Sequence, residues 1–404
     1  MENIETTTER SNPNRIIEVL TAFLKLGLTS FGGPIAHLGY FREEFVVRRK
    51  WVKDEAFADI VALCQFLPGP ASSQVGFVLG ISRGGGLLGG IAAWTAFTLP
   101  SAILLLAFAL GAANFSGPMG QGIIHGLKLV AVAVVAQALW GMARTLTPDR
   151  TRIGIALAAV AGVVFLDTAV GQIGAIAGGA ALGILLCRDT NAPPGHPFDF
   201  QVRRRSALAA LALFAILFLV PPLLYGTGNQ ALRLFEAFYR SGALVFGGGH
   251  VVLPLLETAV VSPGWVSREV FLAGYGATQA VPGPLFTFAA YLGAVAIPAP
   301  NGVTGAMIAL VALFLPGLLL VYGTLPFWDG LRRLPTAQAA MKGANAAVVG
   351  ILAAAFYSPV WTSAVLVPLD FFLALAGFLL LTVWKAPAWM VVLALAAVGA
   401  ISAI

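Results

Sequence analysis

The sequence predicts an all-α polytopic membrane protein. We expect two inverted-topology repeats of about six membrane segments each, with broken or re-entrant helices, and one linking transmembrane helix. Composition is the first reason: 58% of the 404 residues are hydrophobic and 10% are charged, whereas a soluble domain carries about 25% charged residues. The mean hydropathy is +0.88. Long apolar runs and a duplicated pattern of helix-breaking residues are the other two reasons.

Apolar runs long enough to cross a bilayer, about 20 residues each, recur throughout the chain. They include residues 86–112, 122–142, 207–225, 306–322, 371–384 and 388–404. Basic residues cluster in short loops between such runs, as expected for cytoplasmic loops of membrane proteins. We therefore interpret the formal net charge of +6 as information about topology, and we expect a lipid bilayer and no nucleic acid as partner.

One pattern occurs twice in the chain, with an offset of 215 residues from Lys25 to Arg240. Each cation lies six positions before a phenylalanine followed by small or helix-breaking residues, Phe31-Gly32-Gly33-Pro34 and Phe246-Gly247-Gly248-Gly249. A second pair of motifs follows, Gln65-Phe-Leu-Pro68-Gly69-Pro70 and Gln279-Ala-Val-Pro282-Gly283-Pro284. Paired breaks of this kind in apolar segments indicate the substrate site of a transporter.

The duplication divides the chain into four parts. We expect a polar N-terminal tail at 1–14, a first repeat at 15–187, a basic linker with an unpaired transmembrane helix at 188–231, and a second repeat at 232–404. An unpaired helix between two copies of one unit turns the second copy upside down. The arginines of the linker and of the other basic loops can then all face the cytoplasm.

The broken segments at 15–40 and 55–80 leave two topologies open. The loop between them carries five basic residues (Arg42, Arg48, Arg49, Lys50 and Lys53). A full span at 15–40 would place this loop outside, whereas two re-entrant hairpins would keep it inside, and we favour the hairpins. Both versions place irregular backbone around a pathway, because such backbone at membrane depth is tolerated only against protein or a watery cavity.

Lys25 and Arg240 are the main candidates for substrate binding. Ionisable groups within apolar segments usually mark a substrate or ion path, although either cation could instead extend to the interface from near a helix end. Two converging cations would suit a dianion, with a planar fork of donors from the arginine and a compact charge from the lysine.

The helix-breaking residues themselves are further candidates. The glycines of the Phe-Gly-Gly motifs would let an anion approach backbone N–H groups at helix starts, although they could equally serve tight helix packing. Gln65, Ser72 and Gln279 could line a hydrated cavity near the Pro-Gly-Pro motifs, the alternative for hydroxyls being bonds to their own helix. Lys128 and Asn345 occupy matching places (offset 217) and are candidates for the same cavity.

Proton coupling has four candidates: His37, His250, Glu44 and Glu257. Histidine can exchange protons near neutral pH. The competing interpretation is a structural role for both histidines and ion pairs with Arg48 or Arg268 for the two glutamates. Neither a catalytic motif nor a metal-ligand cluster is visible in the sequence, so we expect no enzyme activity, no cofactor and no metal. A gradient or another subunit would supply the energy.

Several of these residues together resemble a known family. Residues 31–42, Phe31-Gly-Gly-Pro-Ile-Ala-His37-Leu-Gly-Tyr40-Phe-Arg42, with 65–70 resemble the signature of the chromate ion transporter family, and 246–254 with 279–284 look like its degenerate second copy. The length resembles the family's long-chain, two-domain branch. Gly249 stands where the first copy has Pro34, so the two copies need not play equal roles.

The resemblance implies a multi-pass protein of the bacterial inner membrane that exports chromate, driven by the proton motive force, with sulfate as a competing analogue. Combined with the cations, it predicts a secondary active transporter for a tetrahedral dianionic oxyanion, giving chromate resistance, with protons as partners. A sulfate or other oxyanion transporter or exchanger remains an alternative, as does a passive anion channel. The oligomeric state, with a homodimer among the options, is left open.

Overall fold

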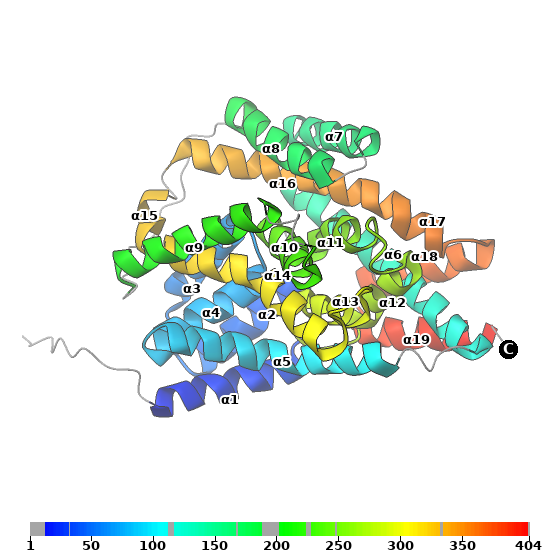
Figure 1. Cartoon of the computed structure of the whole chain (residues 1–404), viewed down its shortest axis with the longest axis horizontal. Coiled ribbons are helices and arrows are strands. Elements are labelled where there is room, and N and C mark those ends of the chain that lie inside the picture. Colours follow the sequence, from blue (N-terminus) through cyan, green and yellow to red (C-terminus); the bar gives the residue numbers. More distant parts are fainter. Residues whose placement is uncertain are drawn as a thin grey trace, which may run out of the picture.

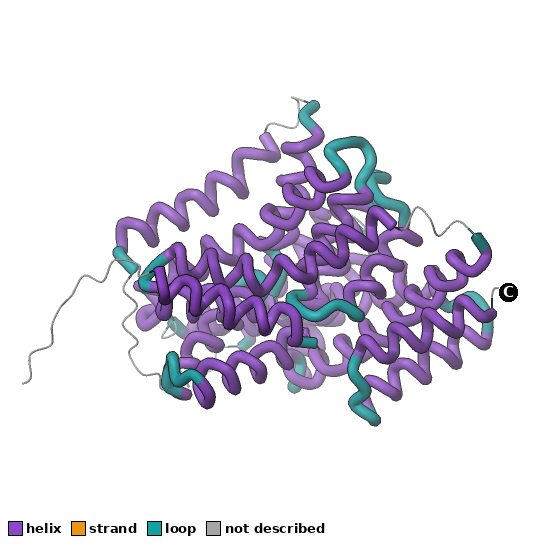
Figure 2. The backbone as a smooth tube through the Cα atoms, turned by 90° about the horizontal axis from the view of Figure 1, so that it is seen from below, coloured by secondary structure: helices purple, strands orange, loops and turns teal. Residues whose placement is uncertain are grey.

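The structure is a computed structural model that describes residues 13–31, 33–111, 117–166, 169–187, 202–223, 228–246, 249–331 and 334–402. Within these ranges every regular element is a helix, and helices joined by short loops make up the whole body in Figure 2. The prediction of an all-α protein is confirmed.

The first half of the chain forms eight α-helices and one π-helical turn among its described residues. These are α1 (Pro13–Thr29), α2 (Gly33–Phe41), η1 (Arg42–Arg48), α3 (Asp54–Phe66), α4 (Ala71–Gly84), α5 (Leu87–Gly111), α6 (Pro118–Leu146), α7 (Arg150–Phe165) and α8 (Ala169–Leu186).

A single helix, α9 (Arg204–Leu223), leads to the second half, whose elements follow a similar order. They are α10 (Gln230–Ala243), η4 (Gly249–Val251), α11 (Val252–Val260), α12 (Arg268–Thr278), η5 (Leu285–Thr287), α13 (Phe288–Val295), α14 (Gly302–Thr324), η6 (Leu325–Phe327), α15 (Trp328–Leu331), α16 (Pro335–Ala355), η7 (Phe356–Trp361), α17 (Thr362–Ala364), α18 (Pro368–Thr382) and α19 (Ala388–Ser402).

Helix starts in both halves follow from capping side chains. Asp149 accepts a hydrogen bond from the Arg152 N–H at the start of α7 (2.9 Å), and Asn229 accepts one from the Leu232 N–H at the start of α10 (3.3 Å). Ser267 caps α12 in the same way. A capping oxygen satisfies one of the N–H groups that have no partner within the helix. Helices α3 and α12 both end where a Pro-Gly-Pro motif begins, because proline has no N–H to continue the helical bonding.

Five helical stretches of the described chain are long and apolar enough to cross a membrane. They are Leu87–Gly111, Pro118–Leu146, Arg204–Leu223, Gly302–Phe327 and Pro335–Ala364, and shorter apolar helices lie at Val170–Leu186, Leu285–Val295, Pro368–Thr382 and Ala388–Ser402. Many large apolar side chains on these helices are exposed, which suits lipid and not water. The predicted apolar runs are therefore confirmed as helices of a multi-pass membrane protein.

The chain reverses direction at both breaks of the first half. Lys25 on α1 contacts Glu44 beyond α2, with Nζ and Oε2 at 3.3 Å. Glu18, near the start of α1, accepts hydrogen bonds from the Trp51 indole at 3.1 Å and from the Arg83 guanidinium at 2.7 Å. Since Arg83 lies at the end of α4, both α2 and α4 return to the end of the molecule where α1 begins. These contacts match the hairpin alternative.

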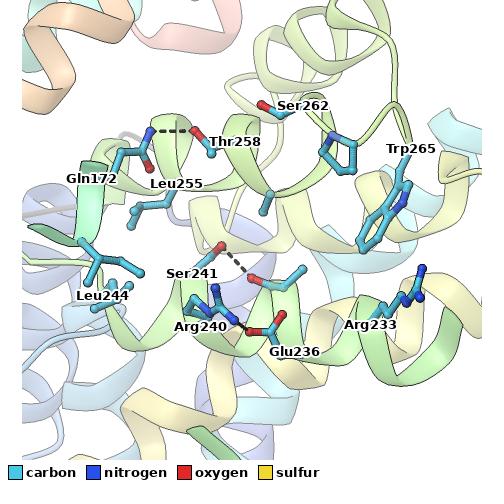
Figure 3. A pocket seen from close by; sticks show the side chains of 14 residues that line it. Gln172, Arg233, Glu236, Arg240, Ser241, Leu244, Leu255, Thr258, Ser262 and Trp265 are labelled. Atoms are coloured by element: carbon cyan, nitrogen blue, oxygen red, sulfur yellow. Dashed lines mark hydrogen bonds and ion pairs between the residues drawn. The ribbon is translucent and has the colours of Figure 1, made fainter. Parts of the chain in front are cut away.

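The second half reverses in the same places. One cavity is lined along its length by α10 and by α11, from Arg233 opposite Trp265 to Leu244 opposite Leu255 (Figure 3). The Ile297 N–H, just beyond α13, donates to the carbonyl oxygen of Trp265, just before α12, at 2.9 Å. Both broken segments of this half therefore also double back.

Matching glycines let equivalent helices of the two halves pack closely. Gly27 places α1 against the backbone of α5 at Phe97, and Gly242 places α10 against the backbone of α14 at Leu313. The positions in each pair differ by 215 or 216 residues, so the packing repeats together with the sequence. Small residues allow such backbone contact between membrane helices.

The last two helices of each half pack on the other half. Helix α6 contacts α18 and α19, while α16 contacts α7 and α8, which lie alongside it in Figure 1. Gly126 of α6 meets the backbone of α19 at Leu395, and Gly343 of α16 meets the backbone of α8 at Gly179. This reciprocal exchange ties the two halves into one body.

Candidate functional site

The four helix breaks meet at the centre of the molecule in two reciprocal backbone hydrogen bonds. The Gly69 N–H, in the first Pro-Gly-Pro motif, donates to the carbonyl oxygen of Val245 at 2.7 Å. The Gly283 N–H, in the second motif, donates to the carbonyl oxygen of Ser30 at 2.9 Å. Ser30 and Val245 directly precede Phe31 and Phe246. Each Pro-Gly-Pro motif is thus bound to the Phe-Gly-Gly break of the other half.

Both central glycines are required by backbone shape and by space. Gly69 has φ +124° and Gly283 has φ +104°, values that residues with a Cβ rarely adopt. A Cβ on Gly69 would lie 2.9 Å from the Cα of Gly317, and one on Gly283 would lie 2.8 Å from the Ser101 Oγ. The two motifs therefore press against matching points of α14 and α5.

A cavity of about 550 Å³ opens beside this junction, and we call it the junction cavity. Gly33 of the first half and Gln279 and Gly283 of the second half line it. His250 lies on its wall, with Nδ1 at 2.6 Å from the Tyr275 hydroxyl. Further lining residues include Gln137 of α6, Thr278 of α12 and Lys385 between α18 and α19. The junction cavity is thus lined by breaks from both halves.

A second cavity, of about 660 Å³, lies between α10 and α11, and we call it the α10–α11 cavity. Arg233, Glu236 and Arg240 project into it from α10 (Figure 3). On the opposite wall, Gln172 of α8 donates to the Thr258 hydroxyl at 2.6 Å. Its charged and polar side chains make this cavity suitable for an ion.

The two predicted cations have different surroundings. Arg240 forms an ion pair with Glu236, one helical turn earlier, within the α10–α11 cavity. Lys25 forms an ion pair with Glu44, which also pairs with Arg48 at 3.1 Å and Arg49 at 2.7 Å. Lys25 lines neither of the two cavities described above. The structure therefore does not bring the two cations together at one point; each has a carboxylate partner of its own.

Glu44 lies in η1, outside the candidate spans, with little of its side chain exposed. Burial alone would raise the pKa of this carboxyl. Hydrogen bonds from Arg49, Lys25 and Arg48 outweigh the burial and hold the pKa below its usual value of 4.5. The group is therefore ionised at neutral pH and serves as the centre of the cationic cluster.

The remaining break residues lie where the motifs predict. Phe31, Pro34 and Phe246 are half-buried beside the breaks, and Gly249 begins η4. Pro68, Pro70, Pro282 and Pro284 flank the two central glycines. Gly32, Gly247 and Gly248 lie outside the described residues.

The polar candidates are spread over several surroundings. Ser72 is buried with its Oγ at 3.4 Å from Nδ1 of His37, which packs edge-on against Phe97 at 5.3 Å. Gln65 is exposed at the end of α3. Lys128 and Asn345 are half-buried on α6 and α16 and line neither of the two cavities. Glu257 pairs with Arg268 at 3.6 Å.

The sequence interpretation missed two glutamates that organise these surroundings. Glu236 is buried and pairs with Arg240, and its position four residues earlier on an amphipathic helix was the available signal. Glu18 contacts Trp51, Arg49 and Arg83. No sequence spacing indicates that pairing, because it depends on the reversal of α2 and α4.

Comparisons with known proteins agree on one family. The model of the chromate transporter family matches residues 17–184 and again 232–400. A chromate transport protein of Pseudomonas aeruginosa is 30% identical over 97% of this chain and 94% of its own length. A chromate transport protein of Cupriavidus metallidurans is 26% identical over 95% of this chain and 92% of its own length.

A probable chromate transport protein of Synechococcus elongatus is 28% identical over 82% of this chain and 81% of its own length. No solved structure gives a significant match. Since the family model covers both halves, the chain belongs to the chromate transporter family.

Proposed function

We propose that this protein is a secondary active transporter that exports chromate across the inner membrane of a bacterium, driven by the proton motive force, and so confers chromate resistance. Membership of the chromate transporter family and two full-length relatives named as chromate transport proteins support the substrate. The apolar helices support a location in the membrane. Sulfate, also a tetrahedral dianion, is the expected competitor.

The observation that carries the proposal is the reciprocal bonding of the breaks, Gly69 to Val245 and Gly283 to Ser30. Irregular backbone of this kind in a membrane protein is tolerated around a pathway, and paired breaks at the interface of two repeats surround the substrate site of known transporter folds. The junction cavity is lined by both halves at this point. We place the transported anion there, between backbone N–H groups and the side chains of His250 and Gln279.

We further propose that the two halves, 15–187 and 232–404, are inverted repeats. Helix α5 begins beside Arg83 and Glu18, and its far end carries Phe108, whose ring lies 5.6 Å from that of Tyr291. The Tyr291 hydroxyl donates to the carbonyl oxygen of Val270 at the start of α12. The hairpins of the second half thus open at the opposite end from those of the first, which supports an inverted arrangement.

Inverted hairpins place Lys25 and Arg240 on opposite sides of the junction, each six residues before its break. In this proposal each cation attracts the anion at its own entrance, because a cleft of one charge sign raises the local concentration of its counter-ion. Alternating access would open the α10–α11 cavity and the Lys25 side in turn. Glu44 and its three cations would close the Lys25 side in the present state.

A flux assay in cells that lack their own chromate transporter tests the proposal. Expression of this chain should lower cellular chromate and raise the tolerated chromate concentration. Radiolabelled sulfate measured alongside chromate separates a chromate exporter from a sulfate transporter or exchanger. Flux that never runs uphill would replace the transporter with a passive anion channel.

A further inference from the structure

Glu236 and Arg240 form a buried ion pair inside a cavity large enough for an oxyanion. The Glu236 side chain is 4% exposed, whereas the Arg240 side chain is 29% exposed toward the α10–α11 cavity. An arginine fork is the group that binds carboxylates and tetrahedral oxyanions alike. The carboxylate of Glu236 therefore occupies the donors that an incoming oxyanion would need.

We propose that Glu236 is a proton-linked counter-ion: an oxyanion displaces it from Arg240 while Glu236 takes up one proton from the water of the cavity. The proposal rests on the proposed anion transport. The proton adds to the carboxylate oxygen that faced Arg240, the Glu236–Arg240 ion pair breaks, and the guanidinium donates instead to the oxyanion. No other bond forms or breaks.

Charge balance in the cavity favours this exchange for a dianion. Among the lining residues, Arg233 and Arg240 are cationic and Glu236 is anionic, a formal net charge of +1. Protonation of Glu236 changes this charge to +2, which matches the charge of chromate or sulfate. A buried carboxylate left ionised beside a dianion would be strongly disfavoured, because like charges at low dielectric repel.

The helices packed on α10 are α9, α11 and α14. Their titratable groups are held elsewhere: Glu257 of α11 pairs with Arg268, and Tyr322 of α14 donates to Ser206. Arg204 and Arg205 lie in the first turn of α9, and Tyr239 of α10 itself donates to the carbonyl oxygen of Phe214. Among these groups, Glu236 is the carboxylate that lines the cavity.

The exchange also fits export. A dianion that moves with one proton carries a net charge of −1, and the inside-negative potential of a cell favours its exit by about 2.3 kcal/mol per 100 mV. The electrical part of the proton motive force would then drive the cargo outward even though a proton leaves with it.

Calorimetric titration of the full-length protein with sulfate tests the proposal. Sulfate stays a dianion across the neutral range, so its own protonation does not contribute. Titration in buffers of different ionisation enthalpy counts the protons taken up, and we expect one per sulfate for the wild type. Affinity should rise as pH falls, by up to about tenfold per pH unit while Glu236 is ionised in the free protein.

Glu236→Gln imitates the protonated carboxyl. It should bind sulfate with no proton uptake, at an affinity independent of pH, and about tenfold more tightly than the wild type at neutral pH, because the binding-competent state is always populated. Glu257→Gln, a carboxyl outside the cavity, is the matched control and should keep the wild-type pH dependence. Arg240→Gln should abolish binding in either background.

No proton uptake by the wild type would overturn the proposal even if Glu236→Gln failed to fold. So would pH-dependent binding that survives in Glu236→Gln. Proton-linked sulfate binding by a protein that transports neither chromate nor sulfate would overturn the proposed transport and leave this inference standing. Transport with pH-independent binding would do the reverse.

Discussion

The backbone N–H of Gly69 donates a hydrogen bond of 2.7 Å to the carbonyl oxygen of Val245, and this bond joins residues from opposite halves of the chain. The bond from Gly283 to Ser30 is its counterpart in the other direction. Neither glycine can move along its hairpin without disturbing the break of the other half. The two bonds therefore give a physical reason for the halves to change conformation together.

Alanine at either central glycine should impair both stability and transport. Gly69→Ala and Gly283→Ala each force a Cβ into a left-handed backbone and against a neighbouring helix. Residues held in such conformations lose about 1–3 kcal/mol of stability. Thermal unfolding in detergent and chromate flux should both show the loss.

Gly39→Ala is the matched control for these two variants. Gly39 is exposed in α2, and a Cβ there would meet nothing within 4 Å. Equal melting temperatures and flux for all three variants would contradict a structural role for the Gly69 and Gly283 conformations.

Loss of either predicted cation should abolish export while membrane insertion stays intact. Lys25→Ala leaves Glu44 paired with Arg48 and Arg49, so we expect the fold to tolerate it. Arg240→Ala leaves Glu236 buried without this partner, so this variant should also lose some stability. Efflux of labelled chromate and the amount of protein in the membrane measure the two effects.

Arg42→Ala provides a charge-matched control, because Arg42 forms an exposed ion pair with Asp54 at 2.8 Å. An exposed pair contributes about 0–1 kcal/mol, so export by this variant should equal that of the wild type. Wild-type export by both Lys25→Ala and Arg240→Ala would remove these cations from the pathway.

The positions of the breaks could be predicted from the sequence, whereas the partners of the charged residues could not. Pro68-Gly69-Pro70 cannot continue a helix whatever surrounds it, and the second copy repeats the constraint. The pairing of Lys25 with Glu44 depends on the reversal of α2. A fixed sequence offset likewise says nothing about direction in space, which is why the two cations were expected to converge.

The exchange of helix pairs between the halves was also beyond the sequence. Helices α7 and α8 follow α6 directly, yet α16 is the helix they cover, and α6 is covered by α18 and α19. Apolar composition fixes that these helices are buried in lipid or protein. It does not choose between two equally apolar neighbours, and small contacts such as Gly343 on Gly179 make that choice.

Lysine at position 240 should be milder than alanine. A lysine keeps the positive charge and can still reach the Glu236 carboxylate one turn away, but it loses the planar fork that donates two parallel bonds. We expect Arg240→Lys to retain part of the export and to bind the anion more weakly. Equal loss of export in Arg240→Lys and Arg240→Ala would mean that the fork geometry, and not the charge, is essential.

The cationic cluster around Glu44 should weaken in acid. The folded-state pKa of Glu44 lies below its usual value of 4.5, so its contribution to stability is present above that pH and disappears as pH falls through the folded-state value. Glu44→Gln should lower the free energy of unfolding by about 1–3 kcal/mol at pH 7. The difference from the wild type should shrink in thermal melts recorded below pH 4.5.

Glu43→Gln is the neighbouring control, because Glu43 is exposed and removal of an exposed charge usually changes stability by less than about 0.5 kcal/mol. A constant difference between wild type and Glu44→Gln at all pH values would contradict the ionised role of Glu44.

Export should stop when the proton motive force is removed. In energised inverted vesicles the interior is acidic and electrically positive, so uptake of chromate there corresponds to export from the cell. A protonophore should abolish accumulation. Valinomycin with potassium, which removes the electrical part alone, should reduce it strongly, because the moving complex carries net negative charge. Vesicles containing Arg240→Ala protein are the negative control. Accumulation that survives the protonophore would exclude coupling to the proton motive force, and equilibration without accumulation in energised vesicles would identify a passive channel.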